Sequence, residues 1–273
     1  MSEDPEQRDA SGRTPLMRAC EEGDLEQVQR LIDKGADIHP DAIRCAAQNG
    51  HAPSVELLSK AGADINDNQG GGESTPLTAA SEEGHVDVVD CLLSLGVDTE
   101  VKDWRGRTAL MVASENEMID VVDRLLAAGC DVNAQDTYGS NPLMWVADGG
   151  HVPIIDRLVV HGADFNHQNN GGETVLMSAS TGGNFEAVDR LLSLGCDVNV
   201  QDKAGWTALM LACSGGKIDV VRLLLDHGAD PLLCNKRGKT AIDFVDDLPR
   251  IQTLLNGLIL LFFHHHHHHH HVP

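Results

Sequence analysis

The sequence predicts an all-α repeat solenoid, a linear array of helix-turn-helix units. Three observations favour this fold class: a constant period, apolar residues at helical spacing within each period, and a glycine where each helix is expected to end. Similar six-residue lines recur every 33 residues and begin at Thr75, Thr108, Asn141, Thr174, Thr207 and Thr240. Equal units fold by stacking on their neighbours, so we expect function on the long open surface of the stack.

The amino-acid composition indicates the cellular compartment and the class of partner. The 273 residues carry a formal net charge of −22, which opposes binding to phosphate backbones, so no nucleic acid partner is expected. Seven cysteines occur without a C-x-x-C pair, which favours free thiols in a reducing compartment over a disulfide framework or a zinc site. The polar, acidic N-terminus is unlike a secretory signal. We therefore expect an intracellular monomer, cytoplasmic or nuclear, with no metal and no cofactor.

The first unit follows a polar extension, residues 1–12, which is expected to be frayed. Thr14 is a helix N-cap, and Pro15 stands at the first helical position, where its missing N–H costs nothing. Gly23 ends this short helix by accepting a positive φ. A second helix with apolar residues at three- and four-residue steps then runs to Gly35. Each unit is therefore predicted to be a helical hairpin.

The repeat domain is expected to cover residues 13–256, with units starting near residues 14, 41, 75, 108, 141, 174, 207 and 240. The second unit is six residues short, and the shortfall lies at residues 37–41. One projecting turn is therefore predicted to be missing or stunted. The next connection, residues 68–73, is rich in glycine and is expected to form a flexible tip.

The C-terminal segment is predicted to close the array. Residues 257–263 are apolar but too few to cross a bilayer, which takes about 20 apolar residues. They are expected to end a capping helix, with a membrane surface or a partner as the alternative contact, and no transmembrane segment is predicted. Residues 264–273 include eight consecutive histidines, either an appended tag or a natural metal-binding tract, and no function is assigned to them.

The third unit carries a family resemblance. It contains Thr75-Pro76-Leu77, Gly84-His85, Val88-Val89, Leu92-Leu93 and the turn Asp103-x-x-Gly106-x-Thr108, and these residues resemble the ankyrin repeat. The match covers about residues 13–244, some seven repeats plus a degenerate C-terminal capping repeat. The resemblance implies an ankyrin-type stack of helix pairs with projecting β-hairpin fingers and a concave surface that binds other proteins. It does not imply an enzyme.

Two departures from the family pattern are expected to have structural effects. Glu117-Met118 replaces Gly-His in the fourth unit, so a residue with a Cβ is expected at a positive φ, with a local distortion or a looser turn. Methionine replaces the family's histidine in four first helices, at Met111, Met144, Met177 and Met210. We expect these flexible side chains to fill the gaps between helices.

The residues predict no catalytic site, because repeated units do not bring dissimilar groups together in one pocket. His51, His85 and His151 occupy the same place in their units and are interpreted as structural rather than as metal ligands. The glycines at 70–72 follow no strand and precede no Gly-Lys-Ser/Thr, so they are not a phosphate loop.

Fingertips and the ends of first helices would face a partner if the resemblance holds. The predicted partner-binding residues combine aromatic rings, basic fingertips and acidic helix ends: Trp104, Arg105, Arg107, Tyr138, Trp145, Lys203, Trp206, Lys236, Arg237, Glu82, Glu83 and Glu115. This mixed polarity favours a protein over a uniformly charged polymer. Each fingertip ring has packing on the adjacent finger as its alternative role, and Trp145 has packing in the core.

Four asparagines follow Gly-x-Asp-x, where some ankyrin repeats are modified by asparaginyl hydroxylases: Asn66, Asn133, Asn166 and Asn199. Their alternative role is to cap the turn with side-chain hydrogen bonds. Taken together, the sequence predicts a non-enzymatic adaptor or scaffold that binds a protein on its concave surface. The alternative is an inhibitory or regulatory subunit that blocks an enzyme or channel by contact.

Overall fold

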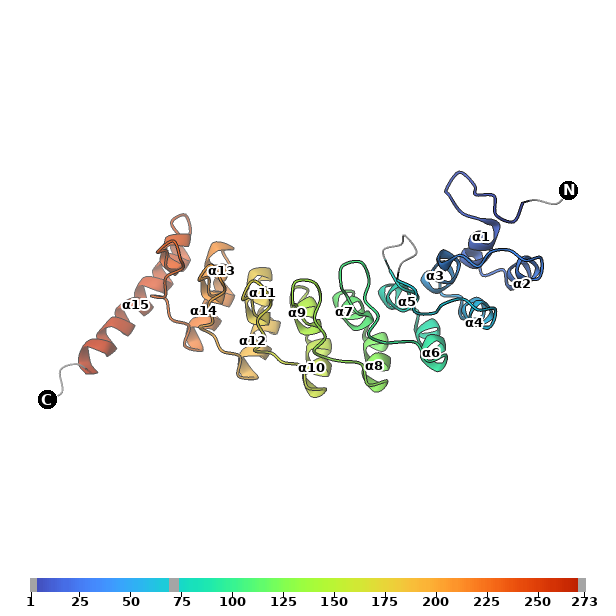
Figure 1. Ribbon diagram of the computed structural model, residues 1–273. Coiled ribbons are helices and arrows are strands. Elements are labelled where there is room, and N and C mark those ends of the chain that lie inside the picture. The colour runs from blue at the N-terminus through green and yellow to red at the C-terminus, as the bar shows by residue number, and fades with distance from the viewer. Residues whose placement is uncertain (1–3, 69–73, 270–273) are drawn as a thin grey trace. The chain divides into compact units, whose positions relative to one another are not determined.

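The computed structural model describes residues 4–68 and 74–269, and it divides the chain into two compact units, Met1–Thr137 and Tyr138–Pro273. Within each unit a first helix alternates with a second helix, as predicted, and each helix packs on its counterpart in the next repeat (Figure 1). The glycine-rich tip predicted at 68–73 lies, apart from residue 68, outside the described residues.

The N-terminal unit has two rows of helices. The first helices are α1 (Pro15–Glu22), α3 (Pro40–Gln48), α5 (Pro76–Glu83) and α7 (Ala109–Glu115). The second helices are α2 (Leu25–Asp33), α4 (Ala52–Lys60), α6 (Val86–Ser94) and α8 (Ile119–Ala127). Consecutive members of each row are in contact, so the unit has no single closed core.

The C-terminal unit repeats this arrangement. Its first helices are α9 (Pro142–Ala147), α11 (Val175–Gly182) and α13 (Ala208–Ser214), followed by the 3₁₀ helix η1 (Ala241–Phe244). Its second helices are α10 (Val152–Val160), α12 (Phe185–Ser193), α14 (Ile218–Asp226) and α15 (Pro249–His269).

Side-chain caps fix where the first helices begin. Thr14 Oγ1 accepts a hydrogen bond from the backbone N–H of Met17 at 3.2 Å, and Asn141 Oδ1 accepts one from Met144 at 3.0 Å. The same bond is made by the threonines that precede four other first helices: Thr75, Thr108, Thr174 and Thr207. Each such cap contributes about 1 kcal/mol to helix stability. The capping role predicted for Thr14 is thus observed, and the later repeats share it.

Apolar residues at helical spacing form the packed interior of each unit. In α6, for example, Val88, Val89 and Leu92 are completely buried. Burying each such side chain contributes roughly 1.5 to 3 kcal/mol. The acidic residues between them stay near solvent, and Asp90 of α6 forms an ion pair with Arg124 of α8 at 3.2 Å. Neighbouring second helices are therefore held together by buried apolar side chains on one face and by ion pairs on the solvent-exposed face.

The projecting connections are tight turns without β-hairpin pairing. No β-strand occurs between residues 4 and 68 or between 74 and 269. One finger closes with two backbone bonds, from Asp103 N–H to the carbonyl oxygen of Arg107 at 2.9 Å and from Gly106 N–H to that of Asp103 at 3.0 Å. Another bond, from Lys203 N–H to Gly171, joins two neighbouring fingers. Such isolated bonds do not form a ladder, so the predicted fingers are present as turns only.

The stunted connection predicted near residues 37–41 is also seen. Helix α2 ends at Asp33 and α3 begins at Pro40, so residues 34–39 join them without a finger. The N–H groups of Gly35 and Ala36 bond back to the last turn of α2.

Residues 4–12 are ordered, in contrast to the expectation of a frayed extension. Asp9 Oδ1 accepts hydrogen bonds from Ser11 N–H at 2.9 Å and Arg13 N–H at 3.0 Å, and Asp9 N–H donates to the Arg13 carbonyl. The turn around Asp103 makes the same set of bonds. The segment is therefore the finger of the first repeat.

Glu117 adopts a left-handed conformation, with φ 61°. Its N–H donates to Ser114 at 3.3 Å, and in the preceding repeat Gly84 N–H donates to Ser81 at the same distance. The looser turn expected from the missing glycine is therefore not found. The unchanged hydrogen bonds hold the backbone in place, and the strain stays local to Glu117.

The capping helix is longer than predicted. Helix α15 continues past residue 263 to His269, and the buried residues among its described side chains, Ile251 and Leu255, lie near its start. Leu260 and Leu261 are exposed by 70% and 65%. Within the described parts of the chain, no helix is long and apolar enough to cross a membrane.

Candidate functional site

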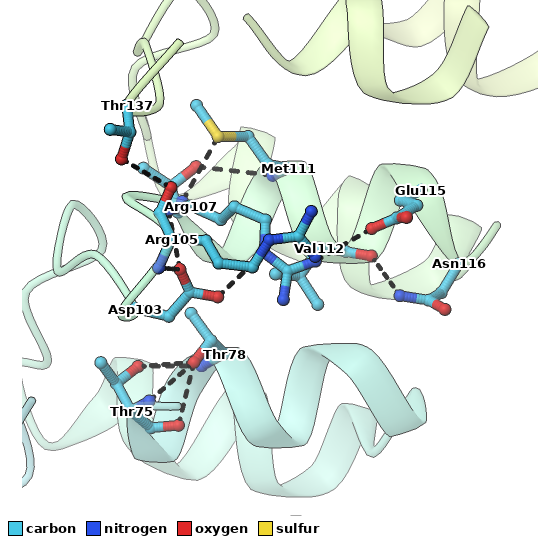
Figure 2. A network of polar contacts seen from close by, with 11 residues as sticks. Thr75, Thr78, Asp103, Arg105, Arg107, Met111, Val112, Glu115, Asn116 and Thr137 are labelled. Carbon is cyan, nitrogen blue, oxygen red and sulfur yellow. Dashed lines mark hydrogen bonds and ion pairs between the residues drawn. The ribbon is translucent and has the colours of Figure 1, made fainter. Parts of the chain in front are cut away.

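The finger at residues 103–107 is held by one buried carboxylate. Asp103 Oδ1 accepts hydrogen bonds from the N–H groups of Arg105 and Arg107, each at 2.9 Å. Its Oδ2 accepts from Arg107 Nε, also at 2.9 Å (Figure 2). The Asp103 side chain is only 1% exposed, so these charge-assisted bonds are shielded from water and fix the turn. The sequence pattern Asp-x-x-Gly-x-Thr, which begins with this aspartate, served to recognise the repeat, but Asp103 was not predicted to be part of the site.

Arg107 joins the finger to the end of a first helix. Its guanidinium lies between Asp103 and Glu115 of α7, with Nη1 3.0 Å from Glu115 Oε2 (Figure 2). The Arg107 side chain is 12% exposed. The predicted partner-binding pair Arg107 and Glu115 is therefore engaged within the unit. Because these groups are already paired, their main effect is to set the angle between finger and helix.

Trp104 stands at the tip of this finger, with 67% of its surface exposed. The Arg105 guanidinium carbon lies 5.9 Å from the centre of the Trp104 ring, within the range of a cation–π contact. Thr137 Oγ1 donates a hydrogen bond to the Arg105 carbonyl at 2.9 Å and so braces the tip from the next finger. Exposed tryptophan beside arginine on a rigid turn is typical of protein interfaces.

The aromatic residues of the C-terminal unit differ in exposure. Tyr138 is 71% exposed, and its carbonyl oxygen accepts a hydrogen bond from Asn170 N–H at 2.9 Å. Trp145 is half-buried on α9. Trp206 is also half-buried, and its ring centre lies 4.5 Å from that of Phe244 in η1. Trp206 thus packs within the unit, although on η1 and not on the adjacent finger that was its alternative partner.

The charged residues predicted to bind a partner are exposed apart from the engaged Arg107. Glu82 and Glu83 are exposed at the end of α5, directly before the left-handed Gly84. Lys203, Lys236 and Arg237 are exposed on fingers of the C-terminal unit.

The asparagines predicted as hydroxylation sites make capping contacts. Asn66 Oδ1 accepts a hydrogen bond from Asp98 N–H at 2.8 Å. The Oδ1 atoms of Asn166 and Asn199 likewise each accept a hydrogen bond from a backbone N–H of the following repeat. Asn133 donates its own N–H to Asp131 Oδ1 at 2.9 Å. The amide oxygens of Asn66, Asn166 and Asn199 thus link neighbouring turns, the alternative that the sequence left open.

Burial makes most of the cysteines unreactive. It raises the pKa of Cys20, Cys130, Cys196 and Cys213 to about 12 by disfavouring the charged thiolate. Among residues 4–68 and 74–269, no three His, Cys, Asp or Glu side chains are placed to hold a metal ion.

Comparison with known families and proteins identifies the repeat. The family described as "Ankyrin repeats (3 copies)" matches residues 43–136, 115–202 and 176–245, and a single "Ankyrin repeat" matches residues 11–43. Human protein phosphatase 1 regulatory subunit 27 is 41% identical over 86 residues, which cover 29% of this chain and 55% of that protein. Palmitoyltransferase AKR1 of Lachancea kluyveri is 32% identical over 114 residues, which cover 37% of this chain and 16% of the relative.

Mouse ankyrin repeat and SOCS box protein 6 is 34% identical over 104 residues, which cover 35% of this chain and 25% of that protein. The chain therefore spans about half of one relative and a quarter or less of the others. The family matches extend from residue 11 to residue 245, over most of the described helix pairs. The chain belongs to the ankyrin repeat family.

Proposed function

We propose that this chain is a non-enzymatic adaptor or scaffold that binds a protein partner through its fingers and the ends of its first helices. Ankyrin repeats are protein–protein interaction modules, and the family membership supports this class of function. The free cysteines support a reducing compartment inside the cell, where we propose that the chain acts as a monomer.

The observation that carries the proposal is the exposure of Trp104 on a turn fixed by Asp103. A tryptophan ring that is already held in place loses little conformational entropy when a partner covers it. Removing a central aromatic contact commonly costs 2 kcal/mol or more of binding free energy, which is roughly a thirtyfold loss of affinity.

Affinity capture from lysate, followed by comparison of Trp104→Ala with the intact chain, tests the proposal. We expect the variant to lose most of the captured partner and to keep its melting temperature, because the exposed ring contributes little to packing. Trp206→Ala is the matched comparison: its ring packs on Phe244, so it should lower the melting temperature. Undiminished capture by both Trp104→Ala and Tyr138→Ala would contradict the assignment of the fingertips.

A regulatory subunit is the second candidate function. It is supported by the 41% identity to a human protein that is named a regulatory subunit of protein phosphatase 1. Mixing the purified chain with the phosphatase 1 catalytic subunit should then change its activity toward a phosphoprotein. If the two proteins neither bind nor affect the activity, this candidate fails and the adaptor proposal stands.

An acyltransferase function does not follow from the similarity to palmitoyltransferase AKR1. The alignment covers only 16% of that enzyme, and the matched part of this chain is ankyrin repeat.

A further inference from the structure

Two neighbouring fingers of the C-terminal unit carry a group of cations, which we call the basic tip. It consists of Lys203, Lys236, Arg237 and Lys239, all of them exposed. The two fingers lie side by side, because Lys236 N–H donates to the Ala204 carbonyl oxygen at 2.9 Å. The four charges are therefore gathered over two adjacent turns of a chain whose net charge is −22.

The acids of these fingers are turned toward the backbone. Asp202 Oδ1 accepts hydrogen bonds from the N–H groups of Ala204 and Trp206, at 2.9 and 2.8 Å. Asp243, which follows the second finger in η1, accepts at Oδ2 from Thr240 N–H at 2.8 Å. The ion pairs found among the described residues include none of the four cations. The surface that the fingers present to solvent is therefore positive.

The turn beneath the cations does not depend on their side chains. Asn235, only 6% exposed, accepts hydrogen bonds at Oδ1 from the N–H groups of Arg237 and Lys239, at 2.9 and 3.0 Å. Its own N–H donates to the Lys239 carbonyl oxygen. The basic tip is thus a preorganised backbone that carries free ammonium and guanidinium groups, so binding does not have to order the turn itself.

We propose that the basic tip binds a short acidic segment of a protein partner. The inference rests on the proposed protein-binding function and adds the chemistry of the partner. At physiological salt, charges further apart than about 8 Å are largely screened, so a short carboxylate-rich segment would sense mainly the four cations. A long polyanion such as nucleic acid would also extend over the acidic remainder of the chain and be repelled.

A titration with labelled peptides tests the inference on the intact chain. Fluorescence anisotropy would compare a peptide of about 12 residues of alternating Glu and Gly, its Gln counterpart, and a single-stranded DNA long enough to extend well beyond the two fingers. We expect saturable binding of the Glu peptide that weakens at least about threefold when salt is raised from about 50 to about 300 mM. The double variant Lys236→Glu/Arg237→Glu should bind the Glu peptide at least about tenfold more weakly.

The control is Lys34→Glu/Arg222→Glu, which reverses one exposed cation directly after α2 and one on α14 and changes the net charge equally. It should bind within about twofold of the intact chain, because those side chains lie off the fingers. Equal binding of the Gln peptide, tighter binding of DNA, or no effect of the finger variant would overturn the inference. If the peptide titration fails while Trp104→Ala still loses the captured partner, the basic tip is rejected and the proposed function remains in place.

Discussion

Glu117 is the residue at which the repeat pattern and local conformation conflict most directly. Its φ of 61° is costly for a side chain with a Cβ, whereas glycine adopts it freely at the corresponding position, Gly84. We predict that Glu117→Gly raises the free energy of unfolding by about 1 kcal/mol. Glu83→Gly, in the last turn of α5, should instead lower it by about 0.5 to 1 kcal/mol. Urea denaturation measures both changes, and a loss in Glu117→Gly would contradict the strain.

Met118 occupies a position at which other repeats form a bond between neighbours. His51 Nε2 lies 2.9 Å from the Glu21 carbonyl oxygen, and His85 Nε2 lies 2.9 Å from that of Gln48. Met118 covers Gly84 in the same manner but has no ring nitrogen. We predict that Met118→His adds a hydrogen bond and stabilises the unit by about 1 kcal/mol. Met118→Leu is the control, and equal melting temperatures of the two variants would contradict this reasoning.

The buried thiols predict how stability depends on pH. Burial raises the pKa of Cys213 from 9.0 to about 12, whereas in the unfolded chain the thiol deprotonates near its ordinary value. Between these values the unfolded state binds fewer protons, so the free energy of unfolding falls as pH rises. Urea midpoints at about pH 8 and about pH 10.5 should show this decline. Cys213→Ala should make it shallower, and Cys234→Ala, at an exposed thiol, should leave it unchanged.

At the scale of the element, the finger is the part that the structure explains best. Asp103 uses both carboxylate oxygens, one for the backbone of the turn and one for Arg107. In the finger of the last repeat Asn235 makes the backbone bonds with a neutral amide oxygen. The backbone bonds of the turn therefore need only a side-chain oxygen that accepts hydrogen bonds. The ion pair with Arg107, which links the finger to the helix, needs a charged carboxylate.

We predict that Asp103→Ala lowers the free energy of unfolding by about 2 to 4 kcal/mol, because it removes the acceptor and leaves Arg107 beside Glu115 alone. Asp103→Asn should cost clearly less, since it keeps the acceptor for the turn. Chemical denaturation of both variants separates the two contributions. Equal losses would mean that the ion pair alone holds the finger.

At the scale of the whole molecule, the period made the helices predictable. Thr14 and Thr108 mark helix starts because a cap acts within its own turn, and the apolar spacing of α6 reflects local geometry. The finger at Asp9 was missed, although Asp9 stands before Gly12 and Thr14 at the same spacing as in the later fingers. The repeated pattern could have identified it.

The orientation of the site residues was less predictable, because it depends on contacts between segments. From the sequence, the Arg107 side chain could point either to solvent or to Glu115. Its orientation depends on how the finger is placed against α7 in the folded chain. Trp206 turns from the surface because Phe244 of the following repeat offers a ring to pack against. Trp104 makes no such ring contact among the described residues and is 67% exposed.

Hydroxyl-radical footprinting with the captured partner tests most directly whether recognition takes place at the fingers. Trp104 and Tyr138 should be oxidised readily in the free chain and protected in the complex. Phe185, 46% exposed at the start of the second helix α12, should be oxidised equally in both states. Protection of Phe185, with Trp104 and Tyr138 as reactive as in the free chain, would contradict the proposed binding surface.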